Sequence, residues 1–410
     1  MARTALTVIG NGMAAGRFLE ELLPIAGSRY GIDVFGAEPH GTYNRVMLSP
    51  VLSGEMGLPE IMIHDRDWFR DNGITLHSDC RIEAIDTRRK CIRSAAGRIH
   101  EYDRLVIATG SSPVRLALPG SDLPGVISFR EIRDVEMMLD SASRGERAVV
   151  IGGGLLGLEA ASGLVKQGMG VTVVQRSGAL MNRQLDAPAA AYLLRQLRRE
   201  GLEFRLGLET RAFLGKGCVS AVSLADGSEL EADLVVVAAG IQPNRALAKA
   251  AGIACGRGIL VDDRLRTSVA DVYALGECVE HRGRTYGLVA PLYEMATACA
   301  RQLAGVDDRY VGSVSPTRLK VTGIELFSMG AFAPGAGESL VLEDPRGDIY
   351  RRLIVADGRL SGAVLYGDTG LSAWYEDLIN SGERITAIRD RLMFGPPNAP
   401  GLTKEQQQAA

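Results

Sequence analysis

The chain contains the same two-part pattern twice: a Gly-rich strand–turn–helix, then far downstream a strand ending in a turn of small residues and glycine. The first copy opens with "ALTVIGNGMAAGRFLEELL" and closes with "DRLVIATGSSP". The second opens with "RAVVIGGGLLGLEAASGLVKQ" and closes with "ADLVVVAAGIQP". A Gly-rich turn between a strand and a helix is typical of dinucleotide binding. Two copies therefore predict two dinucleotide sites in one polypeptide, and they indicate a protein that passes electrons between two dinucleotides.

The first site begins with Leu6 to Ile9, a short apolar run that predicts a buried parallel strand. Gly10 then allows a tight turn, Gly12 lets the backbone approach a pyrophosphate, and the small Ala15 lets helix and strand pack closely. A helix is expected to run through Arg17 to Leu23, and its N-terminal amides favour phosphate charge.

Other residues are expected to complete this first site. The second strand, "GIDVFGAE", places Glu38 where it would bind ribose hydroxyls. The further cofactor contacts that we expect are Ile82, Ala108, Thr109 and Gly110. A Gly-rich turn on its own also occurs in plain strand–helix packing, so this copy alone is only moderately specific.

The second site has the full G-x-G-x-x-G spacing. Val149 to Ile151 form the expected strand, and the glycines of the turn are Gly152, Gly154 and Gly157. Gly240, in the closing turn, is a further expected contact.

The residue expected to contact the ribose in this second site is not acidic. The position holds Gln175, followed by Arg176, with Arg183 beyond. An acid there bonds a free 2′-hydroxyl and repels a 2′-phosphate, whereas an arginine pairs with the phosphate. The pattern favours NADPH modestly, and the alternative is that Arg176 is a solvated residue at the end of a strand.

A third element connects the two halves. "RTSVADVYALGECVE" predicts a strand from Val272 to Leu275 that ends in Gly276 and Glu277. It resembles the second FAD fingerprint of two-dinucleotide flavoproteins, in which an acid after glycine bonds the ribityl chain of the flavin. That family more often has Asp at this position, so Glu277 is a conservative departure. Together with the other motifs, this element makes the set far more specific than any one of them.

Composition supports an ordinary globular enzyme. The chain has 410 residues, enough for two or three domains, 46% apolar residues and a net charge of −3, so nothing suggests nucleic acid. Met1 to Thr4 leads directly into the first strand, leaving no room for a signal peptide, and no run of eighteen apolar residues offers a membrane span. We expect a cytoplasmic protein that does not associate with membranes.

The cysteines and histidines show no metal-binding spacing. No two cysteines form C-x-x-C or C-x-x-x-x-C, so neither a metal site nor a redox disulfide is expected, and reduced, mostly buried thiols are preferred. Cys278, beside Glu277, is interpreted as a packing residue, and His281 as exposed. Flavin electrons must then leave directly, to an external acceptor or to oxygen. The six cysteines are Cys80, Cys91, Cys218, Cys255, Cys278 and Cys299.

The order of the motifs predicts an α/β fold with two Rossmann-like three-layer domains, one inserted in the other, and a small C-terminal α+β domain. The FAD domain would comprise residues 1–112 and 241–311, with the NAD(P) domain, 113–240, inserted after the Pro/Gly-rich linker "SSPVRLALPGSDLPG". Residues 312–395 would form antiparallel strands and a helix ending at Gly382. The tail, 396–410, has little apolar content and is expected to be disordered.

The chain to about residue 395 resembles the pyridine-nucleotide-dependent flavoprotein reductases typified by rubredoxin and ferredoxin reductases. Within them it is most similar to the FAD portion of assimilatory NAD(P)H nitrite reductase large subunits and to stand-alone electron-transfer subunits of assimilatory nitrate reductase. The segments that carry this resemblance are "GNGMAAGRF", "TYNRVMLSPVLSGE", "GGGLLGLEAA", "LMNRQLD", "YALGECVEHRGRTYGLVAP" and "YRRLIVADGRLSGAVLYGDT".

The resemblance implies roles for further residues. Tyr43 and Arg45 would line the FAD pyrophosphate or the flavin, and Glu159 would face the junction of nicotinamide and flavin as the catalytic residue. Ala290 and Pro291 would pack by the isoalloxazine. Generic members have a lysine where this chain has Pro50, which leaves a Lys–Glu pair involving Glu159 in doubt. A local helix contact is the alternative role for Glu159.

Three functions remain open from the sequence. The first is an NAD(P)H-dependent reductase that passes electrons through FAD to an iron–sulfur protein of nitrate or nitrite assimilation. Because the chain stops after its third domain, we expect it to feed a separate metalloprotein rather than to reduce nitrite itself. The second is a reductase for a ferredoxin or rubredoxin of an oxygenase system, which shares every cofactor motif. The third is a flavin-bearing redox sensor that binds NAD(P)H and signals by docking to a partner.

Overall fold

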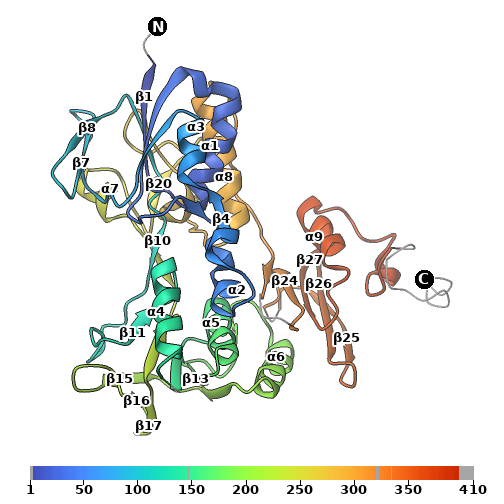
Figure 1. Cartoon of the computed structure of the whole chain (residues 1–410). Coiled ribbons are helices and arrows are strands. Elements are labelled where there is room, and N and C mark those ends of the chain that lie inside the picture. Colours follow the sequence, from blue (N-terminus) through green and yellow to red (C-terminus); the bar gives the residue numbers. More distant parts are fainter. Residues whose placement is uncertain (1–2, 146, 320–322, 334, 397–410) are drawn as a thin grey trace. The chain divides into compact units, whose positions relative to one another are not determined.

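The fold is described from a computed structural model that covers residues 3–145, 147–319, 323–333 and 335–396 (Figure 1). The chain divides into two compact units, which are described separately. Unit 1 comprises the chain up to Val51 together with Met56–Val114 and Ile241–Ser313. Unit 2 comprises Leu52–Glu55, Arg115–Gly240 and the chain from Val314 onward. The expected tail from residue 396 lies, beyond Pro396 itself, outside the described residues.

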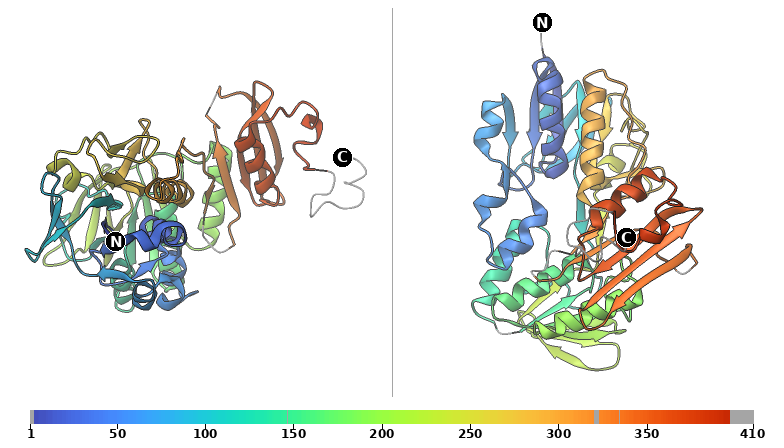
Figure 2. Two further views of the ribbon diagram at one scale, coloured as in Figure 1. Left: turned by 90° about the horizontal axis from the view of Figure 1, so that it is seen from above. Right: turned by 90° about the vertical axis from the view of Figure 1, so that its right-hand side faces the viewer.

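A five-stranded parallel sheet forms the centre of unit 1. Its strands, in spatial order, are β21 (Val272–Ala274), β9 (Arg104–Ile107), β1 (Thr4–Ile9), β2 (Tyr30–Phe35) and β5 (Ile74–His77). Helices α1 (Met13–Ala26) and α8 (Val289–Leu303) lie side by side against it (Figures 1 and 2). The last four residues of β1 are buried, as expected for a parallel strand covered on both faces. Phe18, Leu19 and Leu22 form the apolar face with which α1 covers the sheet.

Smaller elements complete unit 1. An antiparallel sheet contains β6 (Ile82–Asp86), β7 (Cys91–Ser94) and β8 (Ile99–Glu101). Two-stranded pairings join β3 (Thr42–Tyr43) to β4 (Met62–His64), β20 (Ile259–Val261) to β22 (Val279–His281), and β10 (Ser111–Pro113) to β19 (Ile241–Pro243). The short helices are α2 (Leu48–Leu52), which runs into unit 2, α3 (Arg66–Asp71) and α7 (Ala246–Ala250).

The β10–β19 ribbon was not anticipated from the sequence. The expected linker begins with strand β10, and Pro113 lies opposite Ile241 in an antiparallel pair. The chain therefore leaves unit 1 and returns to it at neighbouring positions.

Unit 2 contains a second five-stranded parallel sheet with the same arrangement. Its order is β11 (Val126–Ser128), β18 (Leu234–Val237), β12 (Arg147–Ile151), β13 (Gly170–Gln175) and β14 (Glu203–Leu206). The helices of this part are α4 (Ile132–Ala142), α5 (Leu155–Lys166) and α6 (Ala187–Arg199). An antiparallel sheet is formed by β15 (Thr210–Leu214), β16 (Ala221–Leu224) and β17 (Glu229–Glu231).

In both parallel sheets the strand that leads into the Gly-rich turn is flanked by the next strand in the chain on one side and by a much later strand on the other. In unit 1 the strand β1 lies between β2 and β9, and in unit 2 the strand β12 lies between β13 and β18. Ligands of such sheets bind beyond the carboxyl ends of the strands, at the point where the strand order reverses. Both Gly-rich turns follow the central strand at that point.

The rest of unit 2 is an antiparallel sheet with helices against it. Its order is β23 (Thr317–Arg318), β24 (Leu326–Gly330), β27 (Arg359–Tyr366), β26 (Ile349–Ala356) and β25 (Glu338–Asp344). Strand β27 contacts both α9 (Ser372–Ser381) and α6, which explains its nearly continuous burial. Helix α9 ends, as expected, at Gly382 in the left-handed conformation, with φ of +58°. The predicted fold class is confirmed.

Candidate dinucleotide-binding sites

The first Gly-rich turn, residues 10–12, has the backbone geometry needed to bind a pyrophosphate. We call this turn the first cradle. Gly10 has φ of +111°, and a Cβ there would lie 2.1 Å from the carbonyl oxygen of Ala108. Only glycine fits such a turn. Gly12 is the N-cap of α1 and has no side-chain cap, and a Cβ on it would meet no atom within 4 Å. The N-terminus of α1 therefore has no side-chain cap and has room beside Gly12, an arrangement that suits a phosphate.

Two residues of α1, rather than one, lie in close contact with their neighbours after this turn. Ala15 is completely buried, as a small packing residue should be. The tightest position is Gly16, where a Cβ would lie 2.8 Å from Cγ2 of Thr42. The motif does not point to Gly16, because its neighbour Thr42 lies in β3, a separate segment of the chain.

Glu38 lies in the loop after β2, Tyr43 in the following strand β3, and Arg45 just beyond that strand. The Tyr43 hydroxyl donates to Oε2 of Glu38 at 2.6 Å, and the Arg45 guanidinium pairs with Oε1. The guanidinium also lies over the Tyr43 ring, 5.0 Å from its centroid. A carboxylate oxygen has more than one lone pair, so Glu38 can still accept from ribose hydroxyls. The structure brings these three predicted residues together.

The closing turn of the first copy meets the third motif. The Ser111 hydroxyl donates to Oε2 of Glu277 at 2.7 Å, and Gly276 has φ of +86°. A Cβ on Gly276 would lie 3.1 Å from the Cβ of Ala14. Glu277 is thus held near the start of α1, beside the first cradle.

Asn244 fixes this turn, although it belongs to none of the motifs read from the sequence. Its side-chain amide donates to the carbonyl of Thr109 at 2.8 Å and accepts from Ser112 at 2.7 Å. Thr109 in turn donates to the Asn244 carbonyl at 3.0 Å, and Gly110 adopts φ of +65°. More than 100 residues separate these partners in the chain, so no local pattern could have revealed them.

The remaining residues predicted for the first site occupy separate positions. Ile82 is buried in β6, and the preceding loop is tied to the Glu38 loop because the amide of Asp79 donates to the Glu38 carbonyl at 3.0 Å. Ala290 and Pro291 lie in the first turn of α8, Ala290 exposed and Pro291 buried.

The second Gly-rich turn, residues 152–154, repeats the geometry of the first, and we call it the second cradle. Gly152 has φ of +123° and a Cβ on it would lie 2.4 Å from the carbonyl oxygen of Ala238. Gly154 caps α5 without a side-chain partner, and its Cβ position is open. A Cβ on Gly157 would lie 2.0 Å from the carbonyl oxygen of Gly152. Gly240, in the closing turn, has φ of +113°.

Gln175 connects this turn to the loop that follows β13. Its Oε1 accepts from the amide of Gly153 at 2.9 Å, and its Nε2 lies 2.6 Å from the Ser177 hydroxyl. Arg176 and Arg183 extend from the same loop and are exposed. Within the described part of the chain, neither guanidinium has a hydrogen-bond or ion-pair partner.

Glu159 lies in the second turn of α5 and is only 5% exposed. Among the residues that the structure describes, no other Asp or Glu is buried to this degree. A buried carboxylate is costly unless it is compensated, and such groups concentrate at functional sites.

His281 corrects one expectation. It was expected to be exposed, but it is completely buried, with Nε2 2.9 Å from Oδ1 of Asp263. Hydrogen bonds from Arg282 and His281 lower the pKa of Asp263 to about 2. The centroid of the His281 ring also lies 4.9 Å from the centroid of the Tyr310 ring. His281 is therefore a packed, hydrogen-bonded residue of the β20–β22 region.

All six cysteines are free, and only two of them are fully buried. The expectation of mostly buried thiols is therefore wrong, because Cys218 is exposed and three others are partly exposed. Cys278 donates to backbone carbonyls of Leu275 and Ile107, and burial raises its pKa to about 11. This thiol stays protonated at neutral pH, which agrees with a packing role.

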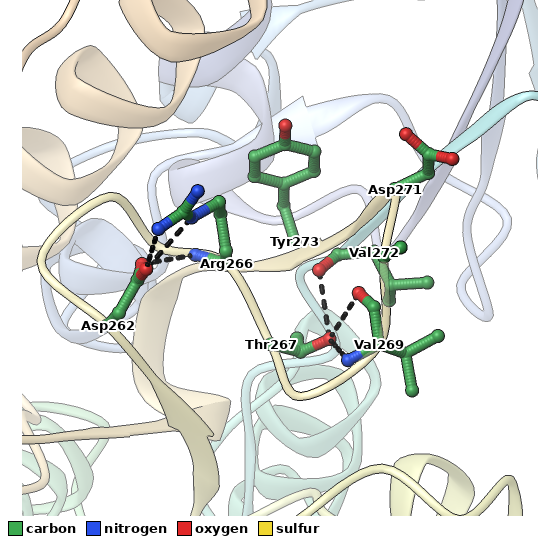
Figure 3. A pocket seen from close by; sticks show the side chains of 8 residues that line it. Asp262, Arg266, Thr267, Val269, Asp271, Val272 and Tyr273 are labelled. Carbon is green, nitrogen blue, oxygen red and sulfur yellow. Dashed lines mark hydrogen bonds and ion pairs between the residues drawn. The ribbon is translucent and has the colours of Figure 1, made fainter.

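A cavity of about 240 Å³ lies elsewhere, at the start of β21 (Figure 3). It is bordered by an ion pair between Arg266 and Asp262, and by Thr267, whose hydroxyl donates to the carbonyl of Val272. Gly276 and Glu277 follow the other end of the strand. Since ligands bind beyond the carboxyl ends of parallel strands, this cavity is not the dinucleotide site.

The described residues contain neither a metal-binding cluster nor a membrane-spanning helix. No group of three His, Cys, Asp or Glu side chains there could hold a metal ion. None of the described helices combines the length and the apolar character needed to cross a bilayer.

Family models match two parts of the chain. The model described as pyridine nucleotide-disulphide oxidoreductase matches residues 4–302, which include both cradles. The chain belongs to this family. The C-terminal domain of rubredoxin NAD+ reductase matches residues 316–383. This family binds FAD and depends on NAD(P)H, and the two open cradles fit two dinucleotides, so the chain is an FAD- and NAD(P)H-dependent oxidoreductase.

Curated relatives agree with the resemblance. The chain is 43% identical to nitrite reductase [NAD(P)H] of Bacillus subtilis over 90% of its own length and 46% of the relative. It is 42% identical to the assimilatory nitrate reductase electron transfer subunit of the same organism, over 90% of this chain and 48% of that one. The chain thus spans about half the length of these relatives.

A third relative matches over nearly its whole length. The ferredoxin–NAD(+) reductase subunit of a benzene 1,2-dioxygenase system from Pseudomonas putida is 32% identical, over 88% of both chains. Among solved structures, an NAD-dependent persulfide reductase from A. fulgidus has a TM-score of 0.89 and 25% identity, covering 99% of this chain and 82% of that one.

Proposed function

We propose that this chain takes a hydride from NAD(P)H onto FAD and passes electrons to a separate iron–sulfur protein of nitrate or nitrite assimilation, in the cytoplasm. The observation that supports this most is the identity of 42–43% over 90% of the chain to two proteins named for nitrite and nitrate reduction. That similarity extends past the two cradles into the C-terminal domain.

In this proposal each of the two cradles binds a different dinucleotide. The cradle at Gly12 holds the pyrophosphate of FAD against the start of α1, and Glu38 binds the adenosine ribose. The cradle at Gly154 holds the pyrophosphate of NAD(P)H against the start of α5. Bound FAD supplies a ring that accepts hydride and can release electrons one at a time.

The residues of the chain position the nicotinamide and isoalloxazine rings, and acid–base catalysis has little part in the reaction. Glu277, held by Ser111, bonds the ribityl chain, and Ala290 and Pro291 pack by the isoalloxazine. Glu159 orients the nicotinamide or biases the charge of the flavin. Holding the two rings in contact geometry is the main contribution of the protein to hydride transfer.

The donor preferred in this proposal is NADPH. Two guanidinium groups without partners, Arg176 and Arg183, project from the loop where the ribose of the adenosine would lie. Gln175 is neutral and already bonded to Gly153, so it does not repel a 2′-phosphate.

Electron transfer to a docked partner can be tested directly. The reduced protein is mixed under nitrogen with assimilatory nitrate or nitrite reductase and, separately, with an oxygenase ferredoxin, and reoxidation of the flavin is followed. We expect fast reoxidation by the assimilatory partner, slowed by added salt because transient electron-transfer contacts are governed by charge.

Reoxidation by the oxygenase ferredoxin alone would favour the second function, which the similarity to the benzene dioxygenase reductase supports. A long-lived reduced complex that passes few electrons to either acceptor would favour the redox sensor.

A further inference from the structure

The loop that carries Arg176 and Arg183 ends at a buried carboxylate. We call residues 176–186, between β13 and α6, the nucleotide loop. Asp186 is the N-cap of α6, and its Oδ1 accepts from the amide of Ala189 at 3.3 Å. Its side chain is only 8% exposed. The last residue of the loop is therefore fixed to the helix that follows.

The other oxygen of this carboxylate is bound by the C-terminal sheet. The Tyr350 hydroxyl donates to Oδ2 of Asp186 at 2.6 Å, and Nη1 of Arg352 donates to the same oxygen at 2.9 Å. Both donors lie in β26. Tyr350 is 2% exposed, and burial, followed by the bond to Asp186, raises the pKa of its hydroxyl, which stays a donor.

These hydrogen bonds hold the end of the nucleotide loop to strand β26. Hydrogen bonds to a charged group are about twice as strong as neutral ones, and removing one partner leaves a buried charge incompletely compensated. We refer to Asp186, Tyr350 and Arg352 as the capping cluster.

The nucleotide loop has a second anchor at the Gly-rich turn. The amide of Met181 donates to the Gly153 carbonyl at 2.8 Å, and Leu180 packs so closely that a Cβ on Gly153 would lie 2.7 Å from it. Met181 has φ of +45°, a conformation that a long side chain keeps only where its surroundings impose it. Arg176 and Arg183 thus project from a loop that is held at both sides.

We propose that the capping cluster sets the conformation of the nucleotide loop, so that Tyr350 and Arg352 of the C-terminal domain are positioning residues for NAD(P)H. This inference rests on the proposed function of that loop as the site of the adenosine ribose and its phosphate. A loop ordered before binding loses less conformational freedom when the nucleotide arrives, which strengthens binding.

The same interface supplies a matched control. Asp348, in the turn before β26, pairs with Arg195 and Arg199 on the later turns of α6. These contacts join the C-terminal sheet to α6 without reaching the nucleotide loop. Asp348→Asn removes the charge and keeps a residue suited to the positive φ of +53° at this position.

The test compares Tyr350→Phe and Arg352→Gln with Asp348→Asn in the full chain with FAD bound. KM and kcat are measured for NADPH and NADH with ferricyanide as acceptor, and melting temperature and FAD content are recorded for each variant. For the two cluster variants we expect KM for NADPH to rise about tenfold with kcat little changed, the order expected for one lost bond to a buried charge. For Asp348→Asn we expect less than about a twofold change, because exposed pairs contribute little.

A double variant makes the test specific to the loop. If the capping cluster acts through Arg176, the effect of Arg176→Ala on KM for NADPH shrinks in the Tyr350→Phe background, since coupled sites are not additive. Additive effects, or equal changes in KM for the cluster variants and Asp348→Asn, would overturn the proposal.

The same measurements distinguish an error in the proposed function of the loop from an error in the role of the capping cluster. If the wild-type protein is not reduced by either nucleotide, or if Arg176→Ala leaves both KM values unchanged, the role of the loop itself is wrong. If Arg176→Ala raises KM for NADPH while the cluster variants match wild type, only the inference about the C-terminal domain fails.

Discussion

Replacing Gly12 by valine should abolish FAD binding and leave the apoprotein folded. Gly12 has φ of −86°, which valine can adopt, and a Cβ there meets no protein atom within 4 Å. The cost to the apoprotein is limited to a poorer N-cap, about 1 kcal/mol at most. For a unit of this size that corresponds to a fall of about 2–4 °C in melting temperature.

The effect on the complex is much larger. FAD present at a thousand times its Kd stabilises the protein by about 4 kcal/mol, or roughly 8–16 °C, and the variant should gain none of this. Thermal melts of apoprotein with and without added FAD measure both quantities. A Gly12→Val protein that retains bound flavin would refute the placement of the pyrophosphate, and FMN alone in the wild-type protein would refute the assignment of this site to FAD.

Gly10→Ala is the matched change, and it should fail for the opposite reason. A Cβ at Gly10 would lie 2.1 Å from the carbonyl oxygen of Ala108, at φ of +111°. The backbone conformation alone costs an alanine about 1–3 kcal/mol, and the contact forces the neighbouring turn to move. The apoprotein itself should therefore melt lower, whether or not FAD is added. Equal behaviour of the two variants would contradict this distinction.

Three further predictions concern the donor, the cysteines and acid stability. Arg176→Ala should raise KM for NADPH at least about tenfold and leave NADH nearly unchanged, since a lost contact between charged groups is worth about 1.5–3 kcal/mol; a wild-type preference for NADH of about tenfold or more would contradict this. Replacing all six cysteines by alanine should leave ferricyanide reduction by NAD(P)H largely intact, and its loss at full FAD content would point to a redox thiol. Hydrogen bonds from Arg282 and His281 lower the pKa of Asp263 from 3.8 to about 2, so its contribution is present above about pH 4 and is lost as the pH falls toward 2. Because its side chain is 30% exposed, that contribution is about 1 kcal/mol, and urea melts of Asp263→Asn should lack this part of the pH dependence.

The parts of the site that follow from local spacing could be predicted from the sequence. Gly10, Gly12, Gly152 and Gly154 were identified because each acts within a few residues of itself, through a turn or a helix start. The parallel sheets followed from the same motifs, since a Gly-rich turn between a strand and a helix fits few other folds.

Contacts between distant segments could not be predicted. Asn244 bonds to Thr109 and Ser112, and His281 is buried by Asp263 and Tyr310 rather than exposed. Neither set of contacts follows from local spacing, because the partners of each residue come from other segments of the chain. The contact between α6 and β27 has the same origin.

The β10–β19 ribbon makes residues 114–240 a long excursion that starts and ends within one strand pair. For unit 1, this excursion is entropically a single closed loop, and doubling the length of such a loop costs only about 0.6 kcal/mol. The stability of the parallel sheet of unit 1 is thus nearly insensitive to the size of what is inserted between Pro113 and Ile241. If the inserted segment binds the nicotinamide nucleotide, as we propose, it can be exchanged as one piece during evolution or in the laboratory, so that donor preference changes without rebuilding the sheet of unit 1.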